Sequence, residues 1–195
     1  MKKNNYYLYR ALRFIGKPLF HILFRPKIVN RIDNIDGEPI IFCGNHKSYL
    51  DPLLLIISTK KVVHFLAKKE IFKGMFKGFF YSVGCIPVNR KIKDKNAVET
   101  ALTVLNNNDV IGIFPEGTRN KKQELLPFKY GAVSMASKTN AWVVPFGISG
   151  QYNVFRNNLT ITFGKPYKIK DDLETENKRL MKKVNDLKNK ENYEK

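Results

Sequence analysis

One histidine of this chain has a carboxylate at a spacing that suits acid–base chemistry. His46 follows the apolar run Pro39–Cys43 and Gly44, and Asp51 lies five residues after it. On an unbroken helix five steps turn two side chains about 140° apart, so the pair can meet only across a turn. Asp51 could then bind one imidazole nitrogen and leave the other as a general base. The alternative is a histidine with a purely structural role where a strand leads into a helix.

The sequence lacks the serine elbow that a Ser-His-Asp hydrolase needs. Gly-x-Ser-x-Gly does not occur, and Gly147-Ile-Ser-Gly150 has the wrong spacing. We therefore expect the base to act on a hydroxyl of the substrate, such as an acceptor alcohol that attacks a thioester. Cys43 and Cys85 lie in apolar segments and are expected to be free core thiols. We expect neither a metal site nor a cofactor.

A second motif, Phe-Pro-Glu-Gly-Thr-Arg at 114–119, follows another apolar run. Proline ends a strand and glycine permits a tight turn. Ligands of α/β sheets bind at the carboxyl ends of strands, so Glu116 and Arg119 should lie near His46. Arg119 offers a planar fork for a phosphate, and Glu116 could brace it or hold a substrate hydroxyl. Taken alone, the motif could also be a surface turn with a salt bridge.

Alternating apolar segments must position these residues. Asp51 is the expected N-cap of a helix whose first residue is Pro52. The pattern predicts strands at 39–43, 62–66, 85–88, 110–114, 142–148 and 159–163, and helices at 53–58, 96–106, 130–138 and 173–187. Strands that alternate with helices indicate the α/β class. We expect a single domain over 31–195, with a mixed sheet flanked by helices on both faces and an amphipathic C-terminal helix.

The basic charge of the chain is concentrated near its start. Lys and Arg number 35 against 17 Asp and Glu, a net charge of +18, and eight bases precede Asp33, the first acid. This asymmetry indicates a polyanionic partner, either nucleic acid or anionic lipid. Over 1–30 the apolar residues Leu8, Leu12, Ile15 and Leu19 recur at helical spacing, which favours a membrane-surface arm. The alternative is a helix packed on the core with solvated lysines.

The arm contains a proline, and a second stretch further along the chain resembles the arm in its pattern. Pro18 is expected to divide the arm into two short helices and to open the second. Further on, Phe72, Met75, Phe76, Phe79 and Phe80 also fall at helical spacing, with lysines at 69, 73 and 77. This Phe-rich helix could contact lipid, line an acyl groove or pack on the core. Secretory leaders and runs of about 18 apolar residues are lacking, so we expect a peripheral or monotopic protein on the cytoplasmic face of the cell membrane.

Four ordered blocks resemble the glycerolipid acyltransferase family, and in particular the 1-acyl-sn-glycerol-3-phosphate (lysophosphatidic acid) acyltransferases. The blocks are Asn45–Asp51, Gly84–Arg90, Phe114–Arg119 and Val143–Ile148. Similar segments also occur at Ala67–Phe72 and Phe128–Gly131, so the likeness spans about residues 30–165. The second block departs from the family, where aspartate is common at the position of Asn89.

The resemblance implies a role for each matching residue. His46 would be the general base and Asp51 its orienting partner. Glu116, Gly117 and Arg119 would bind the substrate's glycerol phosphate, with Arg90 and Lys68 as further phosphate ligands. Val144 and Pro145 would line the acyl-donor side. Surface roles for Arg90 and Lys68, and a buried-strand role for Val144 and Pro145, remain as alternatives.

The implied reaction moves a fatty acyl group from an acyl carrier protein or coenzyme A thioester to lysophosphatidic acid, giving phosphatidic acid. Another lysolipid could equally be the acceptor. A basic nucleic-acid-binding domain is the rival from a different class, but helix-turn-helix, zinc-finger and RNA-recognition motifs are lacking. A catalytically silent lipid-surface protein is a third interpretation. We expect a lysophospholipid and an anionic membrane surface as partners, and no nucleic acid.

Overall fold

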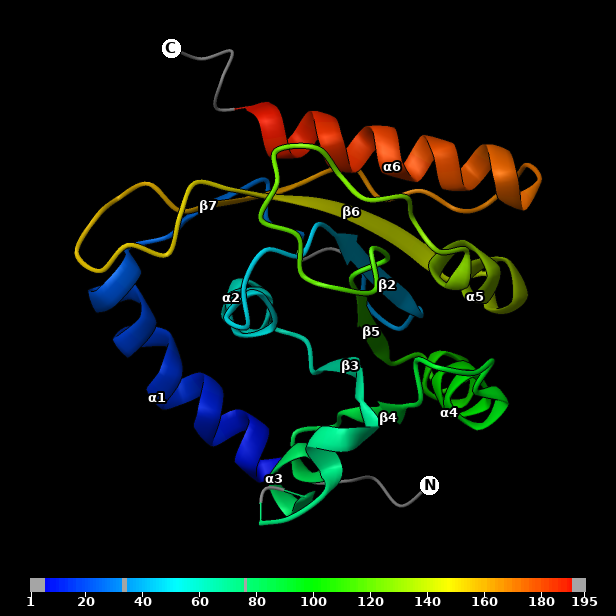
Figure 1. The fold of residues 1–195 in the computed structure, drawn as a ribbon, viewed down its shortest axis with the longest axis horizontal. Coiled ribbons are helices and arrows are strands. Elements are labelled where there is room, and N and C mark those ends of the chain that lie inside the picture. Colours follow the sequence, from blue (N-terminus) through cyan, green and yellow to red (C-terminus); the bar gives the residue numbers. More distant parts are fainter. Residues whose placement is uncertain (1–5, 33–34, 76, 191–195) are drawn as a thin grey trace.

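The apolar runs pair into one seven-stranded sheet with helices on both faces (Figure 1). A computed structural model of the chain describes residues 6–32, 35–75 and 77–190. The strands are β1 (Lys27–Val29), β2 (Ile40–Gly44), β3 (Val63–Lys68), β4 (Ile86–Val88), β5 (Val110–Ile113), β6 (Trp142–Ser149) and β7 (Thr160–Phe163). The helices are α1 (Tyr7–Phe24), α2 (Asp51–Ser58), the 3-10 helix η1 (Lys69–Phe72), α3 (Lys77–Ser82), α4 (Lys95–Asn106), α5 (Gly131–Thr139) and α6 (Leu173–Asn189). The predicted mixed α/β fold is confirmed.

The order and direction of the strands bring five loops to one edge of the sheet. The order is β1-β7-β6-β2-β5-β3-β4, and every neighbouring pair is parallel except β6 with β7. The carboxyl ends of β2, β3, β4, β5 and β6 therefore lie at the same edge. All five residues of β2 are buried, because β5 and β6 flank it and helices cover both faces. The loop that follows β2 starts from one of the most constrained parts of the molecule.

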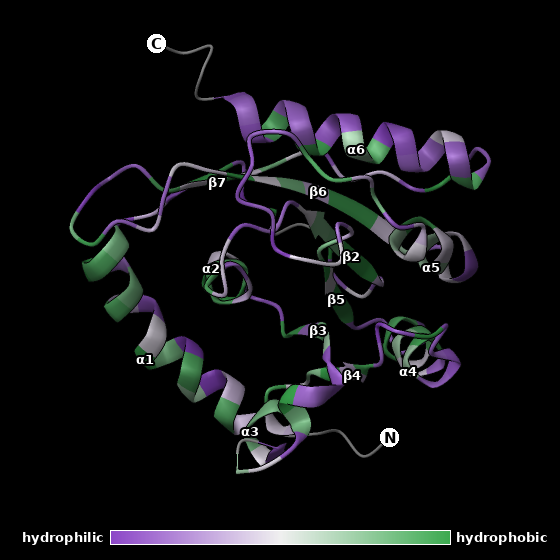
Figure 2. Ribbon diagram, in the orientation of Figure 1, coloured by the Kyte–Doolittle hydropathy of each residue, from purple (hydrophilic) through white to green (hydrophobic). Residues whose placement is uncertain are grey.

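Two apolar clusters hold the helical layers on the sheet. On one face α1 and α2 pack against side chains such as Phe42 and Phe146. On the other face α4, α5 and α6 pack against side chains such as Ile41 and Val143. α6 contributes its buried residues at steps of four and three, and its polar residues dominate the outer surface (Figure 2). The sheet is thus buried on both sides, as the alternating pattern predicted.

The prediction of two short N-terminal helices is wrong. α1 runs unbroken through Pro18, although a proline removes one backbone hydrogen bond inside a helix. Buried anchors on both sides of Pro18, namely Tyr9, Phe20 and Phe24, hold the helix to the core. Pro18 itself lies on the exposed side, where water can solvate the carbonyl group left without a partner. Tertiary packing therefore outweighs the local cost of the proline.

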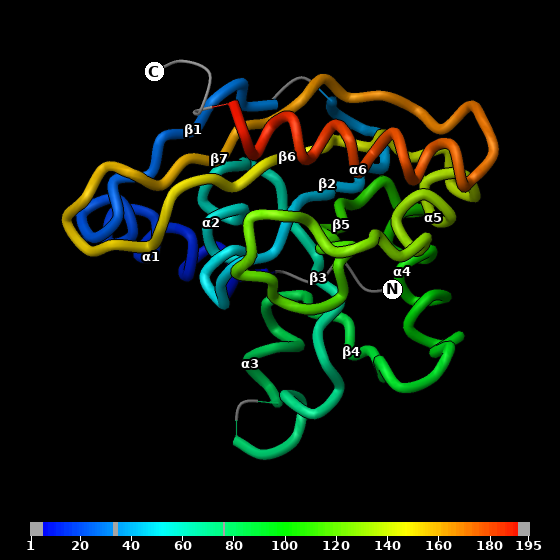
Figure 3. Tube along the Cα trace, turned by 45° about the horizontal axis from the view of Figure 1, so that its top comes forward, coloured from blue at the N-terminus to red at the C-terminus, as the bar shows by residue number. Residues whose placement is uncertain are grey.

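The Phe-rich stretch also differs from its prediction. It forms η1 and α3 instead of one helix, because Gly74 adopts a φ of +82° that ends any helix there. Phe76 lies outside the described residues. Figure 3 shows the segment with η1 and α3 projecting from the body of the molecule beyond β3 and β4. Met75 is 90% exposed on this projection.

A short strand that the sequence analysis did not predict extends the sheet at its far edge. β1 pairs in parallel with β7, and Lys27 is opposite Thr160. β1 lies inside the range 1–30 that we assigned to the membrane-associating arm. The sheet therefore begins before the expected start of the domain at residue 31.

Candidate active site

The predicted base and its carboxylate meet directly after β2. His46 Nδ1 lies 2.7 Å from Asp51 Oδ2, and the side chains are 14% and 0% exposed. A carboxylate next to Nδ1 assigns the proton to that nitrogen, which leaves Nε2 with its lone pair. The imidazole stacks on the Phe114 ring, with centroids 4.2 Å apart and planes 19° apart. The contact with Asp51 and the stacking on Phe114 together fix the orientation of the imidazole ring.

Asp51 is not the N-cap of α2, contrary to our prediction. Leu50 occupies the cap position, and Asp51 is the first helical residue. Its Oδ2 turns back to accept hydrogen bonds from the amides of Lys47 at 2.6 Å and Ser48 at 2.8 Å. The carboxylate therefore closes the tight turn between His46 and α2. This is the turn that the five-residue spacing required.

A tyrosine that the sequence analysis missed binds the other oxygen of Asp51. The Tyr152 hydroxyl donates to Asp51 Oδ1 at 2.6 Å from the loop between β6 and β7. Burial, followed by the nearby charge of Asp51, raises the pKa of this hydroxyl, so it remains a donor. The ring of Tyr152 makes edge contacts with Phe20 and Phe24 of α1. Tyr152 is 101 residues from Asp51 in sequence, and its polar loop carries no motif that could have identified it.

Glu116 joins the second motif to the first. Its carboxylate is 5% exposed and accepts from the His46 amide at 2.9 Å through Oε1. Oε2 accepts from Asn120 Nδ2 at 2.9 Å and from the Leu126 amide at 3.0 Å. The backbone N–H of Asn120 in turn donates to the His46 carbonyl at 2.6 Å. Glu116 thus fixes the loop that carries the base, a task that the motif spacing did not suggest.

The turn at 115–119 gathers two guanidinium groups. Gly117 has a φ of +70°, which glycine adopts without strain, and its carbonyl accepts from Arg90 Nη1 at 2.8 Å. The Arg119 guanidinium lies 3.3 Å from the centroid of the Tyr49 ring, in the loop that carries His46. Both arginines therefore lie at the carboxyl edge of the sheet, close to the loops of β2 and β5. Their planar forks suit a phosphate group.

The remaining predicted site residues are Lys68, Val144 and Pro145. Lys68 ends β3 at the same edge, and its ammonium lies 3.6 Å from Glu70 in an exposed ion pair. Val144 and Pro145 are buried within β6, beside Phe42 and Cys43 of β2. The acyl-donor contact expected of the latter pair, and the phosphate contact expected of Lys68, stay predictions. Within the described ranges, three or more His, Cys, Asp or Glu side chains are nowhere grouped to hold a metal ion.

The motifs and the fold agree with one known family. A family model described as Acyltransferase matches residues 26–149. The chain belongs to this acyltransferase family. The matched range contains the His46–Asp51 pair, the 114–119 turn and six of the seven strands in full, from β1 to β6. The resemblance inferred from the four blocks is thereby confirmed.

Curated members of the family share a name with one another. The 1-acyl-sn-glycerol-3-phosphate acyltransferase of Borreliella burgdorferi is 35% identical over 141 residues, 70% of this chain and 56% of that protein. The one of Bacillus subtilis is 28% identical over 126 residues, 64% of this chain and 62% of that protein. The matches thus span about three-fifths of the length of these relatives.

A solved structure shares the architecture. The crystal structure of the 1-acyl-sn-glycerophosphate (LPA) acyltransferase PlsC from Thermotoga maritima matches with a TM-score of 0.76 at 21% identity. The match covers 92% of this chain and 77% of that one. At this identity the likeness shows a common fold.

Proposed function

We propose that this family member transfers a fatty acyl group from a thioester donor to the free hydroxyl of lysophosphatidic acid at a membrane surface. The observation that carries the proposal is the 2.7 Å contact between His46 Nδ1 and the buried Asp51 carboxylate, beside the arginines of the 115–119 turn. A braced imidazole deprotonates an alcohol, and guanidinium groups recognise a phosphate. The names of the curated relatives support the same acceptor.

The reaction follows from these positions. The phosphate of the acceptor binds Arg119 and Arg90, which brings its free hydroxyl to Nε2 of His46. Nε2 takes the hydroxyl proton while the oxygen attacks the thioester carbonyl. The new C–O bond forms, the C–S bond breaks, and His46 returns the proton to the leaving thiolate. Asp51 stabilises the imidazolium in between. General-base catalysis contributes about 10² to 10⁴ in rate, and fixed positioning adds to it.

The membrane side of the proposal rests on exposed apolar side chains of α1. Phe14 is 84% exposed, Ile15 65%, Leu19 53% and Ile22 61%. Of the helices in the described ranges, none combines the length and apolar character needed to cross a bilayer. An amphipathic helix of this kind lies in the interface of a bilayer, and the basic charge of the arm attracts anionic lipid. We infer a peripheral location on the cytoplasmic face of the cell membrane.

A transfer assay tests the activity. Purified protein receives an acyl-coenzyme A or an acyl carrier protein thioester together with vesicles that contain one lysolipid. We expect product with lysophosphatidic acid, less with lysophosphatidylcholine, and none from His46→Ala with any acceptor. A thermal melt of H46A within a few degrees of the parent shows that the fold is intact. Full activity of H46A, or transfer that ignores the phosphate, contradicts the proposal.

A flotation assay tests the membrane surface and the nucleic-acid rival together. The parent should float with phosphatidylglycerol vesicles. The double variant Phe14→Ser and Ile15→Ser should stay at the bottom of the gradient. Val98→Ser removes an exposed apolar residue from α4 and should float like the parent. Retention on an oligonucleotide with steep salt dependence, without flotation, would favour the nucleic-acid-binding alternative.

A further inference from the structure

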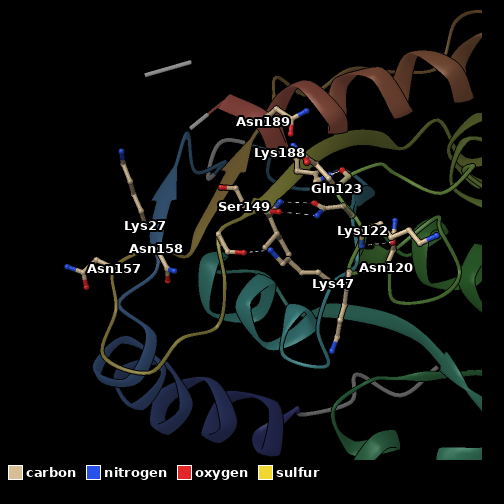
Figure 4. A pocket seen from close by; sticks show the side chains of 14 residues that line it. Lys27, Lys47, Asn120, Lys122, Gln123, Ser149, Asn157, Asn158, Lys188 and Asn189 are labelled. Carbon is tan, nitrogen blue, oxygen red and sulfur yellow. Dashed lines mark hydrogen bonds between the residues drawn. The ribbon is translucent and has the colours of Figure 1, made fainter. Parts of the chain in front are cut away.

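A basic hollow lies on the far side of the loop that carries His46. It encloses about 620 Å³ between the ends of β2, β6 and α6 and the loop after the 115–119 turn (Figure 4). Of its 14 lining residues, five are lysines, six carry side-chain amides and none is acidic. The lysines are Lys27, Lys47, Lys121, Lys122 and Lys188. We call this hollow the lysine pocket.

The lysine pocket adjoins the base but does not contain it. Asn45 and Lys47, the neighbours of His46 in sequence, both line the pocket. Asn45 is tied to the backbone of Ile148 by two hydrogen bonds, of 3.0 and 2.7 Å. The His46 ring instead stacks on Phe114, which is not a lining residue. Residues 45–47 therefore form a wall shared by the pocket and the acid–base pair.

The lining lysines are held in a setting that favours an anion. The Lys188 ammonium donates to the carbonyl of Gln123, and the Lys47 ammonium donates to the carbonyl of Gly150. These carbonyl groups accept hydrogen bonds but carry no negative charge of their own. Burial lowers the pKa of the Lys188 ammonium, and the negative charge of Glu116 opposes this shift. A phosphate bound in the pocket would place negative charge among five lysines in a lining that includes no acidic residue.

We propose that the lysine pocket binds the phosphate-bearing end of a pantetheine thioester, the acyl donor. This inference rests on the proposed function and adds a binding site for the second substrate. Phosphate is common to coenzyme A and to the pantetheine arm of an acyl carrier protein. Side-chain amides of the lining, such as those of Asn157 and Asn158, also suit the ribose and base edges of a nucleotide. The volume lies within the range of about 300–1,000 Å³ that small-molecule sites occupy.

The position of the pocket separates the two substrates. The exposed apolar residues lie on α1, which covers the opposite face of the sheet from α6 (Figure 1). A lipid acceptor enters from the α1 side, and its phosphate binds Arg119 and Arg90 at the carboxyl edge of the sheet. A water-soluble donor enters from the α6 side, and its flexible arm passes the wall at 45–47 to bring the thioester to Nε2. The two phosphates then have different cationic partners.

Kinetics with matched variants test the pocket. The double change Lys122→Gln and Lys188→Gln removes two charges while it keeps similar side-chain lengths. We expect the KM of at least one donor to rise about tenfold or more, with the KM for lysophosphatidic acid within twofold of the parent. A rise for the coenzyme A thioester alone, or for the carrier protein thioester as well, tells which donor the pocket serves. Lys138→Gln, on α5, is the charge control and should leave both constants unchanged.

A binding measurement separates this inference from the proposed function. Calorimetry with coenzyme A, with phosphopantetheine and with adenosine needs no turnover. The parent should bind at least one of the two phosphate-bearing probes, bind adenosine far more weakly, and lose affinity in the double variant and at high salt. Such binding without any transfer would refute only the activity. Donor constants and probe affinities that are unchanged in the double variant, or a selective rise in the lysolipid KM, overturn the pocket assignment.

Discussion

The Tyr152 hydroxyl donates a hydrogen bond to Oδ1 of Asp51 at 2.6 Å, while Oδ2 of the same carboxylate holds His46. Tyr152 in turn lies against Phe20 and Phe24 of α1, and the Phe155 amide donates to the Leu23 carbonyl. The helix that presents apolar residues to the outside is thus in contact with a residue that positions the acid–base pair. The contacts of Tyr152 therefore serve both to dock α1 and to align His46 through Asp51.

Tyr152→Phe removes only the hydroxyl and keeps the ring between α1 and Asp51. A hydrogen bond to a charged group contributes about 1.5–3 kcal/mol, so we expect kcat to fall about tenfold or more. Both KM values should stay within twofold, because Tyr152 is a positioning residue. Proton NMR should show the hydrogen-bonded imidazole proton of His46 shifted or broadened. An unchanged kcat and an unchanged imidazole signal would show that Asp51 needs no support from Tyr152.

Local sequence signals predicted the parts of the site that are close together in the chain. The His46–Asp51 contact spans one turn, and its residues are five apart. The strands β2 and β5 are apolar runs ended by glycine or proline, so their limits follow from the sequence to within one residue. The motif at 114–119 follows β5 directly. Its place at the sheet edge could therefore be predicted.

Contacts between distant segments could not be predicted in this way. β1 has three residues, and its pairing with β7 joins positions about 130 residues apart. Tyr152 reaches Asp51 only because β6 lies next to β2. The run of α1 through Pro18 depends on its packing against the core, which propensity does not describe. Each miss is a case in which tertiary structure decides a local outcome.

Glu116→Gln tests the link between the two motifs. The carboxylate accepts three hydrogen bonds while it is 5% exposed, and an amide would set its NH₂ group against one of those donors. We expect a loss of about 1–3 kcal/mol in the free energy of unfolding, and a lower kcat because the His46 backbone shifts. Glu124→Gln, an exposed neighbour, should change stability by less than about 0.5 kcal/mol. Equal stability of the two variants in urea titrations would contradict this account.

Tyr49 provides a test of how Arg119 is held. The guanidinium lies 3.3 Å from the ring centroid, and Tyr49 is 78% exposed. An exposed cation–π contact contributes about 0.5–1 kcal/mol, so Tyr49→Leu should raise the KM for the lysolipid about two- to fivefold. Tyr49→Phe keeps the aromatic face and should match the parent. If the Phe and Leu variants have the same KM, the ring does not position Arg119.

Gly147 determines how closely α6 can approach the sheet. A Cβ atom there would lie 2.3 Å from the backbone nitrogen of Lys188, and backbone cannot move aside as a flexible side chain can. Gly147→Ala should therefore push the end of α6 away from β6 and cost about 1–3 kcal/mol of unfolding free energy, as overpacking in a core does. Because Lys188 lines the lysine pocket, the donor KM should rise as well. Gly131→Ala is the control: a Cβ at that position meets nothing within 4 Å, and alanine favours the helix, so its melting temperature should equal or exceed that of the parent. A Gly147→Ala protein with the melting temperature of the Gly131→Ala protein would mean that α6 does not pack against β6 at this distance.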